Sequence, residues 1–67
     1  MDKIVILGAG ESGIGAAILA QKKGFEVFVS DFGTIKPNYI EQLEKNNIPY
    51  EQGKHSEDII LKAKKVI

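Results

Sequence analysis

The chain has 67 residues, nine of them basic and nine acidic, so its formal net charge is zero. Proteins that bind a nucleic-acid backbone normally carry a basic patch, and this balance argues against a nucleic-acid partner. The chain has no cysteine, which excludes a disulfide framework and a thiolate metal site. A domain of this length buries only about 60% of the surface of its unfolded chain, so we expect marginal stability.

The apolar segments near the N-terminus, residues 4–7 and 14–20, do not form a signal peptide. Asp2 offsets the charge of Lys3, and Glu11 with four glycines interrupts the apolar run. No apolar stretch reaches the roughly 20 residues that a membrane-spanning helix needs. We therefore expect a soluble, cytoplasmic protein with no membrane partner.

The first half of the chain predicts a strand, a helix and a second strand. Residues 3–7 are a short continuous aliphatic run, which is typical of a parallel strand buried on both faces. A helix is expected to open near Ser12 and to stop at Gly24, with lysines in its last turn. A second strand is expected over residues 26–30 and ends at Asp31.

The second half repeats this alternation. Pro37 suits the first turn of a helix whose Ile40 and Leu43 face inward and which stops at residues 46–47. A third strand is expected over residues 48–51, and Pro49 places it at a sheet edge because proline cannot donate a ladder hydrogen bond. Ser56 is a plausible start for a helix over residues 59–63, and residues 65–67 begin a fourth strand.

The predicted fold class is α/β, a three-layer Rossmann-like parallel sheet with the order β-α-β-α-β-α-β. The Rossmann strand order 3-2-1-4 puts the third strand at the edge, in agreement with Pro49. We expect the fold to be truncated at its fourth strand and the chain to be a fragment of a longer protein. Its exposed sheet edge is expected to promote self-association, partial unfolding or a domain swap.

The residues Gly8, Gly10 and Gly13 match the pattern G-x-G-x-x-G. In this pattern the first glycine allows a tight turn, the second lets a phosphate approach the backbone, and the third lets the helix pack closely on the sheet. The pattern follows an expected strand, opens an expected helix and precedes an acidic residue at the next strand end, which strengthens it. The alternative is a helix-packing turn that binds nothing.

Three polar residues accompany this loop. Asp31 can accept hydrogen bonds from a ribose diol or a base N–H and disfavours a ribose 2′-phosphate, and hence NADP; its alternative is a solvated loop carboxylate. Ser12 can donate its hydroxyl to a phosphate or cap the helix. Glu11 would repel a diphosphate, so we expect its side chain to point away and only its N–H to contribute.

The remaining polar residues give weaker signals. His55 is the only histidine, and a surface position is its simplest interpretation, although residues 53–55 follow a strand at the edge where α/β sheets bind ligands. No catalytic dyad, metal site or Walker A pattern is visible, so this segment is not expected to hydrolyse ATP by itself.

Three segments together resemble one known family: residues 3–17 with the glycine loop, residues 27–31, and Glu-Gln-Gly-Lys-His at residues 51–55. They resemble the amino-terminal domain of the UDP-N-acetylmuramoyl-L-alanine:D-glutamate ligase (MurD) family, over essentially the whole chain. The resemblance implies that this domain binds the UDP part of the substrate. The glycine loop then approaches the diphosphate, and the acidic strand end holds the uracil.

Carried over by position, the resemblance puts Gly10, Glu11 and Ser12 in the phosphate loop and Asp31 at the uracil position. Phe32 stands where some members have a polar residue, which removes a second uracil hydrogen bond but allows the ring to cover the base. Glu11 likewise replaces an apolar residue found in some relatives. The position of Gly53 implies a loop near the substrate. The implied binding residues are Gly8, Gly10, Glu11, Ser12, Gly13, Asp31, Phe32 and Gly53.

The resemblance further implies a three-domain ligase that uses ATP and Mg²⁺ to join D-glutamate to UDP-N-acetylmuramoyl-L-alanine through an acyl-phosphate. Residues 1–67 would be part of its UDP-binding domain, inactive alone, and the ATP, magnesium and D-glutamate sites would lie in later domains. On physical grounds the stretch from loop to acidic strand end equally fits an NAD-binding oxidoreductase domain or an NAD-sensing regulatory module.

Overall fold

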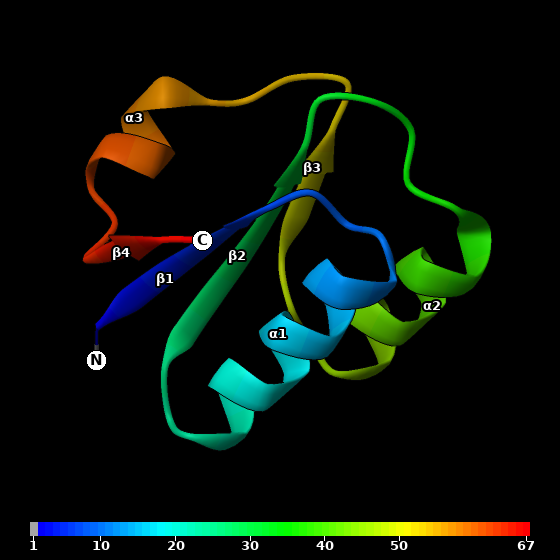
Figure 1. Cartoon of the computed structure of the whole chain (residues 1–67), viewed down its shortest axis with the longest axis horizontal. Helices are drawn as coiled ribbons and strands as arrows, with labels where there is room; N and C mark the ends of the chain where they lie inside the picture. The colour runs from blue at the N-terminus through cyan, green and yellow to red at the C-terminus, as the bar shows by residue number, and fades with distance from the viewer. Residues whose placement is uncertain (1) are drawn as a thin grey trace.

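The computed structural model describes residues 2–67, in which strands and helices alternate along the chain (Figure 1). The elements are β1 (Lys3–Leu7), α1 (Glu11–Lys22), β2 (Glu26–Asp31), α2 (Pro37–Lys45), β3 (Tyr50–Gln52), α3 (Glu57–Leu61) and β4 (Lys65–Val66). All seven expected elements are therefore present. The expected bounds are shifted by one or two residues at several ends.

The strands form one 4-stranded parallel sheet in the order β3-β2-β1-β4. The central pair β1–β2 runs in register from Lys3 opposite Glu26 to Leu7 opposite Ser30. Pro49 precedes the edge strand β3, and its carbonyl accepts a hydrogen bond from the Val29 N–H at 3.1 Å. Proline can thus accept a ladder hydrogen bond, and the N–H donor that it lacks is not needed at a sheet edge. The observed order confirms the predicted strand order.

The helices lie on both faces of the sheet, α1 and α2 on one and α3 on the other (Figure 1). This follows from the handedness of parallel crossovers. The chain moves outward from β1 through β2 to β3, and then returns past β1 to β4, so that its last crossover must pass over the opposite face. The predicted three-layer α/β fold is confirmed.

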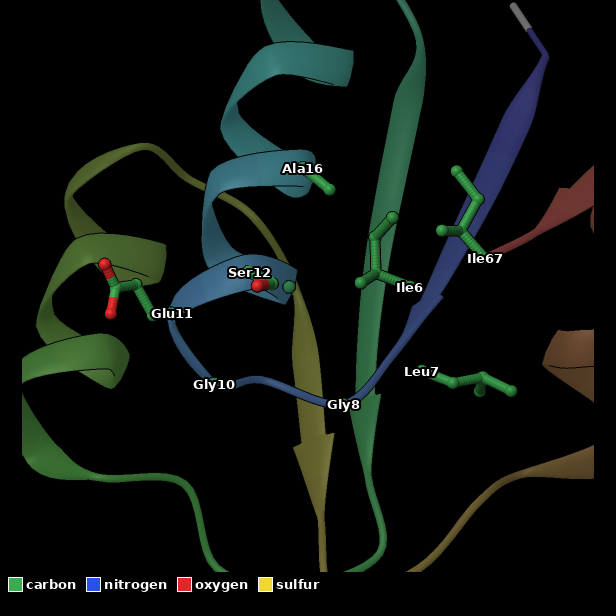
Figure 2. A pocket seen from close by; sticks show the side chains of 9 residues that line it. Ile6, Leu7, Gly8, Gly10, Glu11, Ser12, Ala16 and Ile67 are labelled. Atoms are coloured by element: carbon green, nitrogen blue, oxygen red, sulfur yellow. The ribbon is translucent and has the colours of Figure 1, made fainter.

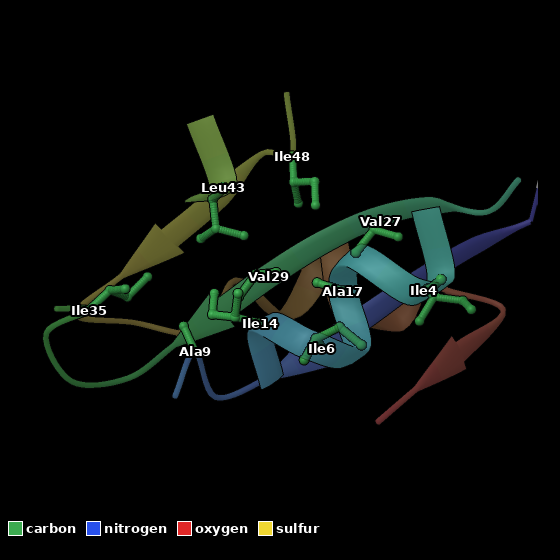
Figure 3. Close-up of a cluster of buried hydrophobic side chains, with 11 residues drawn as sticks. Ile4, Ile6, Ala9, Ile14, Ala17, Val27, Val29, Ile35, Leu43 and Ile48 are labelled. Carbon is green, nitrogen blue, oxygen red and sulfur yellow. The ribbon is translucent and has the colours of Figure 1, made fainter. Parts of the chain in front are cut away.

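The apolar core lies between the sheet and the helices α1 and α2 (Figure 3). Ala17, Val29 and Leu43 are completely buried, which confirms the inward side of α2. In contrast, α3 contributes no buried residue. The core consists of Ile4, Ile6, Ala9, Ile14, Ala17, Ala20, Val27, Val29, Ile35, Leu43 and Ile48.

The start of α1 corrects one expectation. Gly10 occupies the N-cap position in extended conformation, with no side-chain cap hydrogen bond, and the helix begins at Glu11. Ser12 is the second residue of the helix. A side chain caps the free N–H groups from the N-cap position, which precedes the helix. Its interpretation as a helix cap is therefore wrong.

The outer part of the sheet leaves apolar side chains exposed, among them Leu7, Val66 and Ile67. They surround the short pairing of β4 with β1, in which Ile4 and Val5 lie opposite Lys65 and Val66. Self-association through this edge remains a prediction. Within residues 2–67, none of the helices combines the length and apolar character that crossing a membrane requires.

Candidate functional site

The glycine loop between β1 and α1 turns sharply at Gly8, whose φ of 99° lies in the left-handed region that favours glycine. The Gly8 N–H donates to the Ser30 carbonyl at 2.8 Å and so anchors the start of the loop to β2. A Cβ on Gly13 would collide with the Gly8 carbonyl oxygen, so the helix approaches the strand as closely as the pattern predicts. By contrast, a Cβ on Gly10 would meet nothing within 4 Å.

Backbone donors gather at the start of α1. The first helical hydrogen bond runs from the Ile14 N–H to the Gly10 carbonyl at 2.9 Å. The N–H groups of Glu11, Ser12 and Gly13 precede it and have no acceptor within the helix. Together with the positive end of the helix dipole, such donors favour an anion.

An open groove of about 590 Å³ lies beside these donors (Figure 2). One wall is apolar, and the other is formed by the loop and the first turn of α1. The groove lies at the carboxyl end of β1, next to Ile67 at the end of β4, where the crossovers diverge from the central strand. Open α/β sheets bind ligands at this switch point. Its lining residues are Ile6, Leu7, Gly8, Gly10, Glu11, Ser12, Gly13, Ala16 and Ile67.

The two polar side chains of the loop differ in direction. The Glu11 carboxylate points away from Leu7 and Ile67 (Figure 2), as the expected repulsion from a diphosphate requires. Ser12 is exposed at the mouth of the groove. Since its hydroxyl does not cap the helix, donation to a bound anion is the remaining interpretation from the sequence.

Asp31 ties the end of β2 to the glycine loop. Its Oδ2 accepts the Ala9 N–H at 2.8 Å, and its Oδ1 accepts the Gly33 N–H at 2.8 Å. The residue is half-buried, and these two hydrogen bonds fix the direction of its carboxylate. Each carboxylate oxygen has two lone pairs, and the carboxylate therefore retains acceptor capacity for a ligand.

The two remaining predicted site residues lie beside Asp31. Phe32 is 71% exposed. Gly53 has a φ of 79°, and its N–H lies 2.9 Å from the carbonyl oxygens of Asp31 and Gly33. The loop after β3 is thus held against the end of β2, and the predicted residues converge on the carboxyl edge of the sheet.

The sequence analysis missed a polar cluster on the α3 face of the same edge. Ser30 is completely buried. Its Oγ lies 2.8 Å from Glu51 Oε2, 3.2 Å from the Lys54 carbonyl and 2.6 Å from His55 Nδ1. The available signal was a serine inside an otherwise apolar strand, paired with the acidic Glu51 of the next strand.

Glu51 holds this cluster to the start of α3. Its Oε2 accepts the Ser56 N–H at 2.7 Å, and its Oε1 accepts the Ser56 hydroxyl at 2.6 Å. Partial burial by itself raises the pKa of Glu51, but the hydrogen bonds from Ser56 and Ser30 and the charge of Lys54 outweigh it and lower that pKa. The carboxylate is therefore the favoured form.

The fold and site geometry define a class: a Rossmann-like α/β domain with a glycine loop of the dinucleotide-binding type. Within residues 2–67, no three or more His, Cys, Asp and Glu side chains are grouped so as to hold a metal ion.

The family model of the MurD N-terminal domain matches residues 3–64, and the chain belongs to this family. Three proteins named UDP-N-acetylmuramoylalanine--D-glutamate ligase illustrate the similarity. The Porphyromonas gingivalis protein is 64% identical over 64 residues, covering 96% of this chain and 14% of the relative. The Bacteroides thetaiotaomicron protein is 57% identical over 67 residues, covering 100% of this chain and 15% of the relative. The Cytophaga hutchinsonii protein is 51% identical over 66 residues, covering 98% of this chain and 15% of the relative. The chain thus spans about 15% of the length of these relatives.

Among solved structures, bacillithiol disulfide reductase Bdr (YpdA) from Bacillus cereus matches with a TM-score of 0.62 and 25% identity. The match covers 81% of this chain and 19% of the reductase. The same arrangement of strands and helices therefore occurs in an oxidoreductase.

Proposed function

We propose that this chain is the substrate-binding domain of a UDP-N-acetylmuramoylalanine--D-glutamate ligase and holds the UDP part of UDP-N-acetylmuramoyl-L-alanine. The observation that carries the proposal is the groove at the switch point, where free backbone N–H groups face an open space. Family membership supports a UDP nucleotide as the ligand, because the relatives are named for this reaction.

In this proposal each part of the site has one role. The diphosphate lies against the N–H groups of the first turn of α1, with Gly10 leaving room for its approach and Ser12 donating a hydroxyl. Asp31 accepts from the ribose or the base, and the exposed Phe32 covers the base. The turn at Gly53 brings the loop after β3 to the same ligand.

The chemistry of the ligation belongs, in this proposal, to the rest of the protein. The reaction joins D-glutamate to the substrate with ATP and Mg²⁺, in the cytoplasm and as a step of peptidoglycan synthesis. The described residues offer no metal-ligand group. This domain is thus proposed to recognise and orient the substrate, and the ligase activity requires the longer protein.

The alternative is an NAD-binding domain of an oxidoreductase. The fold shared with the disulfide reductase supports it, and an acidic residue at the end of the second strand also suits the ribose of NAD. The ligase is the better supported function because identity to the ligases reaches 64%, compared with 25% for the reductase.

Titration of the chain with UDP-N-acetylmuramoyl-L-alanine, UDP and NAD⁺, followed by amide NMR, tests the proposal. We expect the two UDP compounds to shift the signals of Gly10, Ser12 and Asp31, and NAD⁺ to leave them in place. Shifts with NAD⁺ alone would move the protein to the oxidoreductase class.

A matched pair of glycine variants makes this test specific. Gly10→Ala places a methyl group in the space through which the phosphate approaches, while the φ of −84° at this position suits alanine. Losing one hydrogen bond to a charged group corresponds to about tenfold weaker UDP binding. Gly15→Ala, whose Cβ also meets nothing within 4 Å but lies outside the groove, is the control. Equal UDP affinity of the two variants would contradict the phosphate role of the loop.

A further inference from the structure

Phe32 and His55 come together at the carboxyl edge of the sheet, and we refer to them as the Phe32–His55 pair. Their ring centroids lie 5.7 Å apart at an interplanar angle of 49°. Phe32 follows β2, and His55 lies in the loop after β3. Both residues are exposed, so the pair presents aromatic surface to solvent immediately beside Asp31.

Hydrogen-bond counting assigns the ring proton of His55 to one of its two nitrogens. The Ser30 hydroxyl has one hydrogen and three neighbours within hydrogen-bond distance. Two of these neighbours, the Glu51 carboxylate and the Lys54 carbonyl, can only accept. Ser30 therefore donates to one of them, and the shorter contact is that to Glu51.

The assignment that satisfies both close contacts of Ser30 makes the third neighbour, His55 Nδ1, the donor in its 2.6 Å contact with Ser30. With the proton on Nδ1, the Nε2 atom of neutral His55 is a hydrogen-bond acceptor. Because Ser30 is completely buried within the sheet, it fixes the orientation of an otherwise exposed ring. In this tautomer the ring presents an acceptor nitrogen at the edge where the nucleotide base is expected.

We propose that His55 is a specificity-determining residue for the base: Phe32 stacks on the uracil, and the inclined His55 ring lies at the edge of the base, where Nε2 accepts a hydrogen bond from a base N–H. This inference rests on the proposed function and deepens it. Stacking on aromatic side chains is a common way to hold an unpaired base, and its edge is read by hydrogen bonds. The pair is suited to the base and not to the phosphates because it presents aromatic faces and, in the Nδ1-protonated tautomer, an acceptor nitrogen, which a phosphate cannot use.

The position of the pair supports the same occupant. The phosphate-facing donors lie at the start of α1, at one end of the site. Asp31 bridges from there, because its carboxylate bonds to Ala9 of the glycine loop while Phe32 follows it directly in the chain. A nucleoside diphosphate bound with its phosphates at the loop and its ribose at Asp31 would therefore bring its base to Phe32 and His55.

The first measurement is the protonation of the His55 ring, from the ¹⁵N shifts of its two nitrogens in the labelled chain. His55 is the only histidine of the chain, so its ring signals need no assignment by mutation. We expect the neutral ring to carry its proton on Nδ1. A neutral ring protonated on Nε2 would overturn the inference, because Nε2 would then be a donor.

The second measurement compares UDP with inorganic pyrophosphate, which has no base. We expect Phe32→Ala to weaken UDP binding about tenfold, within the range measured for base–aromatic stacking. His55→Phe keeps an aromatic ring but removes the acceptor, and should weaken UDP binding about threefold to tenfold. Lys22→Ala, at the far end of α1 from the groove, is the matched control and should bind UDP like the wild type.

The pyrophosphate probe separates a base contact from a structural role. If His55 and Phe32 act on the base, their variants should bind pyrophosphate like the wild type. An equal loss of UDP and pyrophosphate affinity would overturn the inference, since it would mean that the variants disturb the loop. Tight UDP binding by both variants would overturn it too, while leaving the proposed function in place.

A modified base tests the hydrogen bond itself. UDP methylated at N3 of uracil lacks the ring N–H, so we expect it to bind the wild type more weakly than UDP and to bind His55→Phe as UDP does. An N3-methyl penalty that is the same in both proteins would overturn the assignment of His55 Nε2 as the acceptor. Wild-type protein that binds NAD⁺ but not UDP would instead refute the proposed function on which the inference rests.

Discussion

The face of the sheet covered by α1 and α2 is held by apolar burial, whereas on the other face α3 contributes no buried residue and hydrogen bonds attach its start to the sheet. On the first face, Ile6, Val29 and Leu43 pack completely out of solvent (Figure 3). On the second, the buried residues Val5 and Ser30 belong to the strands, and no residue of α3 is buried. Glu51 accounts for much of the attachment of α3, because it binds the Ser56 backbone and side chain.

This difference shows how a small domain combines a stable scaffold with an adaptable site. The apolar face fixes the angle between α1 and the central strands, on which the glycine loop depends. The polar face brings the loop after β3 to the carboxyl edge through directional hydrogen bonds. Regions with few buried apolar contacts open at lower free-energy cost than the core, so we expect α3 to exchange its amide hydrogens faster than α1.

The largest expected effect comes from truncating the apolar face. Leu43→Ala removes a completely buried side chain and should lower the free energy of unfolding by about 2–5 kcal/mol. Leu61→Ala, the matched change on α3, removes a side chain that is 81% exposed and should change it by less than about 0.5 kcal/mol. Urea unfolding measures both values, and similar losses in the two variants would contradict the asymmetry between the faces.

The contact between α1 and the glycine loop gives the next largest effect. Gly13→Ala forces a methyl group against the Gly8 carbonyl oxygen and should destabilise the domain by about 1–3 kcal/mol. Gly15→Ala is unobstructed and should stabilise it by up to about 1 kcal/mol, because alanine is the better helix former. Thermal unfolding of the pair checks both signs. A Gly13→Ala variant with the same stability as the wild type would mean that α1 can move away from the strand.

Asp31 attaches the glycine loop to the end of β2 through its hydrogen bonds. In Asp31→Asn one carboxylate oxygen becomes an NH₂ group, which must face either the Ala9 or the Gly33 N–H as donor against donor. We expect a loss of about 1–2 kcal/mol of unfolding free energy and weaker UDP binding. Asp2→Asn, at an exposed position, controls for the change of charge. Unchanged amide chemical shifts of the glycine loop in Asp31→Asn would argue against the hydrogen bond between Asp31 and Ala9.

Glu51 tests the polar face and should give the smallest loss. Glu51→Gln keeps the shape but weakens the hydrogen bonds to Ser30 and Ser56, with an expected cost of about 1 kcal/mol at neutral pH. Because folding lowers the pKa of Glu51 below its ordinary value of 4.5, its contribution is present above that value and is lost as pH falls through the folded-state pKa.

The check is urea unfolding between pH 7 and pH 3 for the wild type and Glu51→Gln. The difference in stability between the two should shrink below about pH 4.5 as Glu51 becomes protonated. Glu41→Gln, on the exposed side of α2, should show no such change. A difference that stays constant with pH would mean that the carboxylate charge does not hold α3.

The sequence by itself determined the succession of strands and helices, because each element carries its own local signal. The aliphatic run of β1 and Pro37 at the start of α2 act within their own segments. The positions of Gly8 and Gly13 were equally readable, since a tight turn and a close helix approach each demand the absence of a Cβ.

Only the tertiary structure decided which side chains that lie far apart in the chain contact one another. Asp31 was identified as an acidic strand end, but its bonds to Ala9 and Gly33 depend on how the loop folds against β2. The bonds among Ser30, Glu51 and His55 require β2 and β3 to pair in one register, which aligns Ser30 with Glu51. A one-residue shift would turn these side chains to opposite faces, and no local pattern in the sequence specifies that alignment.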